Sequence, residues 1–106
     1  MKRVLAYVPD LLFRSRVRGT ASAAGVEVVF ASNGPDLAAK AASGGFDLAL
    51  VDLHAPGALA HLPRGVRVVG FHSHVDVATR RAAEAAGAEA YTNSAFVEAL
   101  PKILQA

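Results

Sequence analysis

The chain has 106 residues, of which 53% are hydrophobic and 19% charged, and it contains no cysteine. These values predict a single domain over residues 1–106 with an apolar core, and they exclude a disulfide framework, a thiolate metal site and a cysteine nucleophile. The net charge of +2 does not call for a nucleic-acid partner. No apolar run has membrane-spanning length, so we expect a soluble, cytoplasmic protein.

Segments typical of strands alternate with segments typical of helices along the chain. Apolar runs rich in β-branched residues predict strands over residues 3–8, 26–31, 46–51, 66–71 and 89–92. Helices are predicted over residues 11–24, 36–43, 75–86 and 96–105. Pro101 is expected in or near the first turn of the last helix, where its missing N–H costs little.

The connection formed by residues 55–64 interrupts this alternation. It contains two prolines and a glycine, and it can hold a turn or so of helix at most. Elsewhere, helix-length connections between strands imply parallel pairing with right-handed crossovers. Five such strands with helices on both faces predict a flavodoxin-like, doubly wound α/β domain, with the strand order left open by the pattern.

Two of the predicted helices have faces that the spacing defines. The face of helix 11–24 that can pack on the sheet consists of Phe13, Val17, Ala21 and Ala24. Arg14 and Arg18 share a different face, which favours a solvated stripe, with an acidic partner or nucleic acid as the alternative. In helix 75–86 the apolar stripe consists of Val75, Ala78, Ala82 and Ala86, and Arg80 and Glu84 are spaced for an ion pair.

The third predicted strand ends abruptly in a carboxylate. Its apolar run is followed at once by Asp52, then by His54 and Pro56. This is typical of a buried parallel strand whose carboxyl end carries an acid into a loop, and open α/β sheets bind ligands at that edge. Asp10 follows the first strand and reaches the same edge.

Several of these junctions resemble those of response-regulator receiver domains of the CheY-like family. Asp10 stands in the place of the family's acidic pair after the first strand, and Asp52 in the place of its phosphorylated aspartate. His72 and Ser73 stand at the usual Thr/Ser after the fourth strand. Residues 86–91, Ala-Gly-Ala-Glu-Ala-Tyr, are similar to the family's AGAxxY segment, and residues 93–96 stand where the family has Lys-Pro-Phe.

The resemblance implies a fold, a site and a set of partners. The sheet would be parallel in the order 2-1-3-4-5, with the third helix shortened. Asp52 would be the phosphoacceptor, with Asp10 and Asp52 holding Mg²⁺. The switch positions would be His72, Ser73, Tyr91 and Ser94. The partners implied are a sensor kinase or a downstream protein, with a homodimer as a further form.

The chain also departs from the family's pattern at two charged positions. Pro9 has no carboxylate where the family has a second acid, and Ser94 is neutral where the family has a lysine. Each loss removes on the order of a few kcal/mol from the stabilisation of phosphoryl transfer. We therefore expect slow or absent phosphorylation, in an atypical or pseudo-receiver that signals through protein contacts and is not an enzyme with a dissociable substrate.

Each candidate side chain has a structural alternative. Asp10 can cap the helix that starts at residue 11, and Asp52 can cap the turn that follows it. Tyr91 can be a core or edge aromatic with its hydroxyl at the surface. His54, His72 and His74 fall at the same edge and could bind a transition metal, although loop histidines are usually exposed, and His61 is expected to be solvated.

Two other functions stay open at this stage. One is a small-ligand or nucleotide-binding flavodoxin-like module, against which the turn after the first strand carries an acid and no glycine-rich phosphate loop. The other is a metal-dependent hydrolase that uses Asp10, Asp52 and His72. The short connection 55–64 is also expected to leave an exposed strip on one face, a candidate contact surface.

Overall fold

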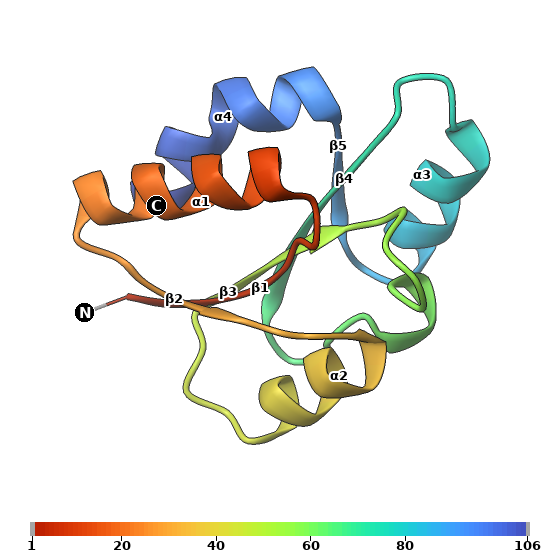
Figure 1. The fold of residues 1–106 in the computed structure, drawn as a ribbon. Helices are drawn as coiled ribbons and strands as arrows, with labels where there is room; N and C mark the ends of the chain where they lie inside the picture. Colours follow the sequence, from red (N-terminus) through yellow and green to blue (C-terminus); the bar gives the residue numbers. More distant parts are fainter. Residues whose placement is uncertain (1, 106) are drawn as a thin grey trace.

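The computed structural model describes residues 2–105 and contains a five-stranded parallel sheet (Figure 1). The strands are β1 (Arg3–Tyr7), β2 (Glu27–Phe30), β3 (Leu48–Asp52), β4 (Arg67–His72) and β5 (Glu89–Thr92). Their order is β2-β1-β3-β4-β5, with every neighbouring pair parallel. The predicted flavodoxin-like fold and the order implied by the resemblance are therefore confirmed.

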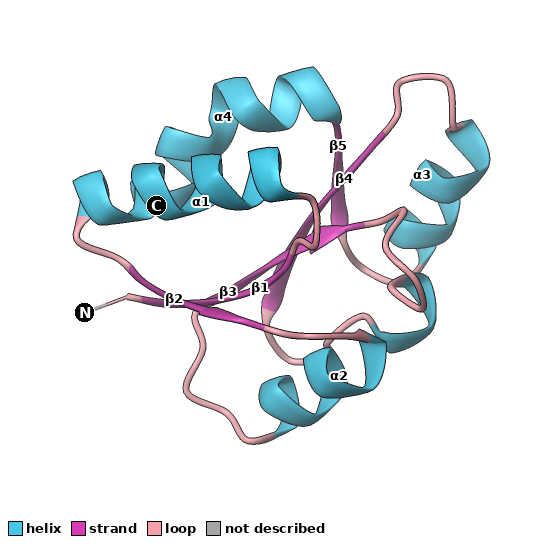
Figure 2. Cartoon of the chain, viewed as in Figure 1, coloured by secondary structure: helices cyan, strands magenta, loops and turns pink. Residues whose placement is uncertain are grey.

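Helices cover both faces of this sheet (Figure 2). They are α1 (Leu11–Ala24), α2 (Gly34–Ala42), α3 (Val77–Ala85) and α4 (Asn93–Gln105). Between β3 and β4 the chain forms only the 3₁₀ turn η1 (Leu59–His61), so the third helix is shortened as expected. α1 and α4 lie side by side on one face, while α2, η1 and α3 lie on the other (Figure 1).

The face covered by α1 and α4 has an aromatic core. The ring of Phe71 stacks between Phe13 and Phe96, with centroid separations of 4.8 and 4.3 Å. Val17 and Ala21 of α1 are buried and Phe13 packs against them, which confirms the predicted face of that helix. Offset aromatic pairs of this kind contribute about 0.5–1.5 kcal/mol beyond the area that they bury.

The face covered by α2 and α3 is built from small residues. Its buried alanines are Ala31, Ala49, Ala55, Ala58, Ala83, Ala88 and Ala90. Gly70 of β4 supports the Leu53 side chain directly, because a Cβ at residue 70 would lie 2.7 Å from Leu53 Cγ. On this face the helices and loops therefore lie close to the sheet backbone, and few large side chains are needed between them.

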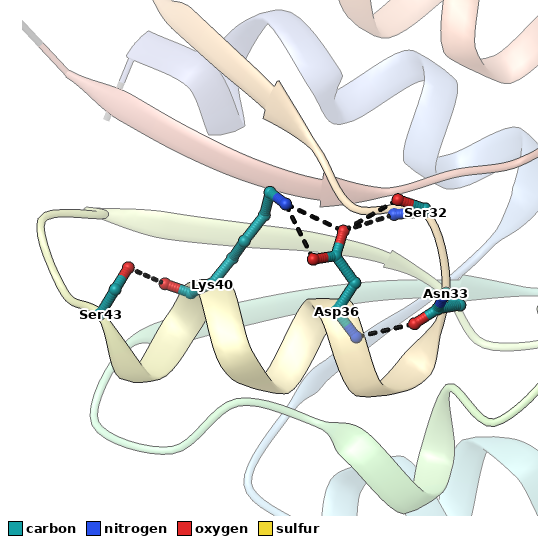
Figure 3. A network of polar contacts seen from close by, with 5 residues as sticks. All are labelled: Ser32, Asn33, Asp36, Lys40 and Ser43. Carbon is teal, nitrogen blue, oxygen red and sulfur yellow. Dashed lines mark hydrogen bonds and ion pairs between the residues drawn. The ribbon is translucent and has the colours of Figure 1, made fainter.

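Polar contacts also fix the start of α2. Asn33 caps the helix by accepting from the Asp36 N–H at 2.8 Å (Figure 3). The Asp36 carboxylate accepts from Lys40 Nζ at 2.8 Å and from the Ser32 N–H and hydroxyl at 2.9 and 3.0 Å. The Lys40 bond, followed by the backbone bond from Ser32, lowers the pKa of Asp36 to about 2.

Two predictions about helices were wrong. Pro101 lies inside α4 and not in its first turn, because the helix begins at Asn93, where Thr92 Oγ1 accepts from the Ala95 N–H at 3.3 Å. The stripe of Val75, Ala78, Ala82 and Ala86 faces away from the sheet. Val75 precedes α3 and is 73% exposed, whereas Ala83 is the buried residue of that helix. The Arg80–Glu84 pair forms as predicted, at 3.5 Å.

His61 and two arginines of α1 contact other residues and are not simply surrounded by solvent. His61 Nδ1 lies 2.8 Å from the Gly57 carbonyl oxygen, and the ring packs on Gly34, where a Cβ would lie 2.6 Å from Nδ1. The prediction that His61 is solvated was therefore wrong. Arg14 and Arg18 both stack on the Phe30 ring, with Cζ 4.4 and 4.9 Å from its centroid.

None of the helices within residues 2–105 is both long enough and apolar enough to cross a membrane.

Candidate functional site

The carboxyl ends of the central strands carry most of the predicted site residues to one edge of the sheet. Asp10 follows β1, Asp52 is the last residue of β3 and His72 is the last residue of β4. Because these strands are adjacent and parallel, their ends form a common rim. This strand order agrees with the prediction that the junctions after β1 and β3 bring their acids to the same edge of the sheet.

Asp52 is half-buried at the end of β3. Its Oδ1 accepts from the His54 N–H at 3.0 Å, and its backbone carbonyl accepts from the Ala55 N–H at 3.0 Å. The carboxylate thus caps the following turn, as the structural alternative expected. Burial raises the pKa of Asp52, the hydrogen bond from His54 opposes that shift, and the charge of Asp10 adds to it.

Asp10 is exposed and caps α1. Its Oδ1 accepts from the N–H groups of Leu12 and Phe13 at 2.9 and 3.1 Å. The predicted N-cap is confirmed. Both bonds go to Oδ1, and no group in residues 2–105 donates to Oδ2, which is compatible with a second role as a cation ligand.

The two carboxylates act on each other, since the negative charge of Asp10 raises the pKa of Asp52. Within residues 2–105, no lysine or arginine forms an ion pair with either acid. Ser94, at the position where the family has a lysine, is an exposed residue in the first turn of α4. The rim therefore joins two carboxylates, and no lysine or arginine of the described chain pairs with either of them.

A second polar cluster lies beside this pair, around the end of β4. His72 is buried and its Nδ1 lies 2.7 Å from the Ser73 carbonyl oxygen, so Nδ1 donates in this hydrogen bond and the ring's Nε2 is left for another partner. That Nε2 is buried and has no hydrogen-bond partner within the described chain. His54 Nε2 accepts from the Ser73 N–H at 3.0 Å, which places the His54 proton on Nδ1. Two histidines thus hold both backbone groups of Ser73.

Asp76 completes this cluster and was missed by the sequence-based prediction. It caps α3 by accepting from the Thr79 N–H at 3.0 Å and the Thr79 hydroxyl at 2.6 Å, and its Oδ2 lies 3.7 Å from His54 Nδ1. The Thr79 bonds lower the pKa of Asp76, and the charges of His54 and His72 add to that effect when these rings are protonated. The sequence signal for this N-cap was an aspartate at the start of a predicted helix, three residues before a threonine.

The remaining candidates lie apart from the acids. Tyr91 is half-buried, packs against the aromatic core and borders a hollow of about 550 Å³ that Arg80, Glu84 and Thr92 also line. His74 is exposed and makes no hydrogen bond or ion pair with the part of the chain described. In residues 2–105, no three histidine or acidic side chains are grouped so as to hold a metal ion.

Comparisons with known proteins assign the fold. No protein-family model matches the chain, and no curated protein matches its sequence. Among solved structures, the chemotaxis response regulator CheY4 of Vibrio cholerae is 25% identical, with a TM-score of 0.79 over 99% of this chain and 97% of that chain. The chain has the CheY-like receiver-domain fold. The expectation of a receiver domain is therefore confirmed at the level of fold, over nearly its whole length.

Two further receiver structures bear on the chemistry and partners of such a site. The receiver domain of a sensor histidine kinase from Pseudomonas aeruginosa, described with a magnesium ion coordinated in its active-site cleft, is 17% identical, with a TM-score of 0.79 over 98% of this chain and 94% of that chain. The Saccharomyces cerevisiae co-crystal of the histidine phosphotransfer protein Ypd1 and the receiver domain of Ssk1 contributes a chain that is 16% identical, with a TM-score of 0.81 over 97% of this chain and 86% of that chain.

Proposed function

We propose that this chain is an atypical receiver domain of two-component signalling whose phosphoacceptor site at Asp52 is incomplete. The observation that carries the proposal is the rim itself, where the charge of Asp10 acts on Asp52, while Ser94 is neutral at the position where the family has a lysine. The receiver fold supports the class of function. The incomplete charge set supports the atypical part of the proposal.

One oxygen of the Asp52 carboxylate caps the following turn, which leaves the other oxygen available as a nucleophile. Oδ1 is engaged by the His54 N–H, while no donor in residues 2–105 bonds to Oδ2. Oδ2 would attack the phosphorus of a donor in line, the new O–P bond forming as the bond to the leaving group breaks. Asp10 and Asp52 would hold Mg²⁺, which neutralises the charge of the incoming phosphoryl group when it is bound. The family's lysine would add a second positive charge, and Ser94 cannot supply it.

Incubation with acetyl phosphate and Mg²⁺, followed by intact-mass measurement, tests the proposal. We expect little or no phosphoryl adduct on the wild-type chain. The paired substitutions Pro9→Asp and Ser94→Lys restore the second acid and the cation. They should increase the phosphorylated fraction by at least about tenfold, because each restores about a kcal/mol or more of charge stabilisation. Asp52→Asn in the restored background should abolish the adduct.

Three outcomes would contradict this proposal. Rapid, complete phosphorylation of the wild type would show that the site is functional as it stands. An adduct that persists in Asp52→Asn would show that another residue is phosphorylated. A restored variant that stays unmodified would show that Asp52 is not a phosphoacceptor. Folding serves as the control. Because burial raises the pKa of Asp52, the ionised group disfavours the folded state at neutral pH, so Asp52→Asn should be at least as stable as the wild type.

The surface beside the rim supports action through protein contacts. Leu11 and Leu12 at the start of α1 are each 78% exposed. Leu12 also lines a hollow of about 350 Å³, together with Ser94 and Val97 of α4. A kinase, a phosphotransfer protein or a downstream partner that reaches Asp52 would cover these leucines. The Tyr91 surface is our second candidate for partner contacts, including a homodimer.

A further inference from the structure

The edge of the sheet formed by β2 has unused backbone hydrogen-bonding groups. β2 pairs with β1 on one side only. The N–H groups of Glu27 and Ala31 donate to carbonyls of the β1 side, at 3.1 and 2.8 Å. Since the groups of a strand alternate in direction, the N–H groups of Val28 and Phe30 face away from β1. This edge holds no proline or lysine between residues 27 and 30 to block another strand.

A shallow apolar hollow follows the same edge. It has a volume of about 290 Å³ and lies between α1 and β2, lined by Ala21, Ser22 and Arg18 on the helix and by Val26, Val28 and Phe30 beside it. The side chains of Val28 and Phe30 are only partly buried. An added strand would therefore find both backbone partners and room for an apolar side chain on the α1 side.

Two arginines that contact Phe30 beside this hollow have no acidic partner in the described chain. Arg14 and Arg18 both stack on Phe30, and among residues 2–105 no acidic side chain forms an ion pair with either. Arg14 Nε is buried without a hydrogen-bond partner. Helix α1 contains no acidic residue at all. A ligand that brings carboxylates to Phe30 would form ion pairs with the guanidinium groups of both arginines.

We propose that the β2 edge binds an extended acidic peptide segment of another protein as an added strand. Its side chains on the α1 side would alternate with those on the other side, so an apolar residue in the hollow and an acidic residue at Arg14 and Arg18 would be two positions apart. A second copy of this chain fits poorly, because pairing β2 with itself would bring the arginines of both copies to one seam. This activity goes beyond the phosphoacceptor function and does not depend on it.

Fluorescence anisotropy with a labelled peptide, Thr-Val-Thr-Glu-Thr-Glu-Thr, tests the proposal on the full chain. We expect saturable binding that weakens by about tenfold or more when glutamine replaces both glutamates, or in the variant Arg14→Gln/Arg18→Gln. The matched control is Arg16→Gln, an exposed arginine of the same helix that has no contact with Phe30, and it should bind within about twofold of the wild type.

Two further measurements separate strand addition from simple charge attraction. A peptide with proline in place of the central threonines cannot pair along its backbone and should lose binding. Amide chemical shifts should change most at Val28 and Phe30. The proposal is overturned if the proline peptide or a single-stranded DNA of equal charge binds as tightly, if the shifts fall elsewhere, or if no peptide binds. If the arginine double variant fails to fold, the charge test uses Arg14→Lys/Arg18→Lys instead. This variant keeps the positive charges, so it should still bind the glutamate peptide more tightly than the glutamine peptide.

Discussion

The two faces of one sheet are packed in different ways. On the side of α1 and α4, three phenylalanine rings stack between helices and strands, and leucines and valines surround them. On the side of α2 and α3, most buried positions are alanine, one helix is reduced to η1, and α3 buries a single residue, Ala83. Stability should therefore concentrate on the aromatic face, while the alanine face depends on close approach and polar contacts.

The largest expected effect is on the aromatic face. Phe71→Ala removes the middle ring of the stack and should lower the free energy of unfolding by about 3–5 kcal/mol. Urea unfolding followed by circular dichroism measures the loss. The control on the opposite side is Val77→Ala at a residue that is 53% exposed, where the change should stay within about 0.5 kcal/mol. Similar losses at the two positions would show that the stack around Phe71 does not concentrate stability on the aromatic face.

The next largest effect concerns close packing on the alanine face. Gly70→Ala places a Cβ against Leu53 and should cost about 1–3 kcal/mol, because the leucine must move from its position. A double-mutant cycle with Leu53→Ala measures the coupling. The double variant should lose less stability than the sum of the two single variants. Additive losses would show that Leu53 and Gly70 do not limit this layer.

A smaller effect is expected at the start of α1. Asp10→Ala removes the acceptor for two N–H groups of the helix and should cost about 1 kcal/mol, whereas Asp10→Asn keeps the acceptor and should cost less. Thermal or urea unfolding of the two variants makes the comparison. An equal loss in both would mean that the charge of Asp10, and not its hydrogen bonds, supports the helix.

The smallest effect is a pH dependence on the α2 side. The folded-state pKa of Asp36 is lowered to about 2 by Lys40 and Ser32, so the ionised group stabilises the fold above its unfolded pKa. This contribution should disappear as the pH falls from about 4 to about 2. The stability difference between the wild type and Asp36→Asn should shrink over that range. Glu84→Gln, which breaks the exposed pair with Arg80, serves as the comparison. A constant difference for Asp36 would exclude the ion pair as its cause.

The sequence predicted what depends on local pattern and on topology. The strands, the Asp10 cap and the convergence of Asp10 with Asp52 all follow from apolar runs and parallel connections. The exposed stripe of α3 could not be predicted, since alanine contributes to an apolar pattern whether or not a helix packs closely. Pro101 was misplaced because the side chain of Thr92 extends the helix start by one turn. The His54, Ser73 and Asp76 contacts join separate loops, and only the folded chain brings them together.

The position of β1 has a consequence for the exchange of amide hydrogens with solvent. β1 lies between β2 and β3, and residues Val4 to Tyr7 are almost completely buried. Amides there can exchange with deuterium only when the whole sheet opens, whereas β2 and β5 can release theirs by local fraying. The same holds for the middle strand β3, so the slowest-exchanging protons of the molecule should lie in β1 and β3 and report its global unfolding free energy.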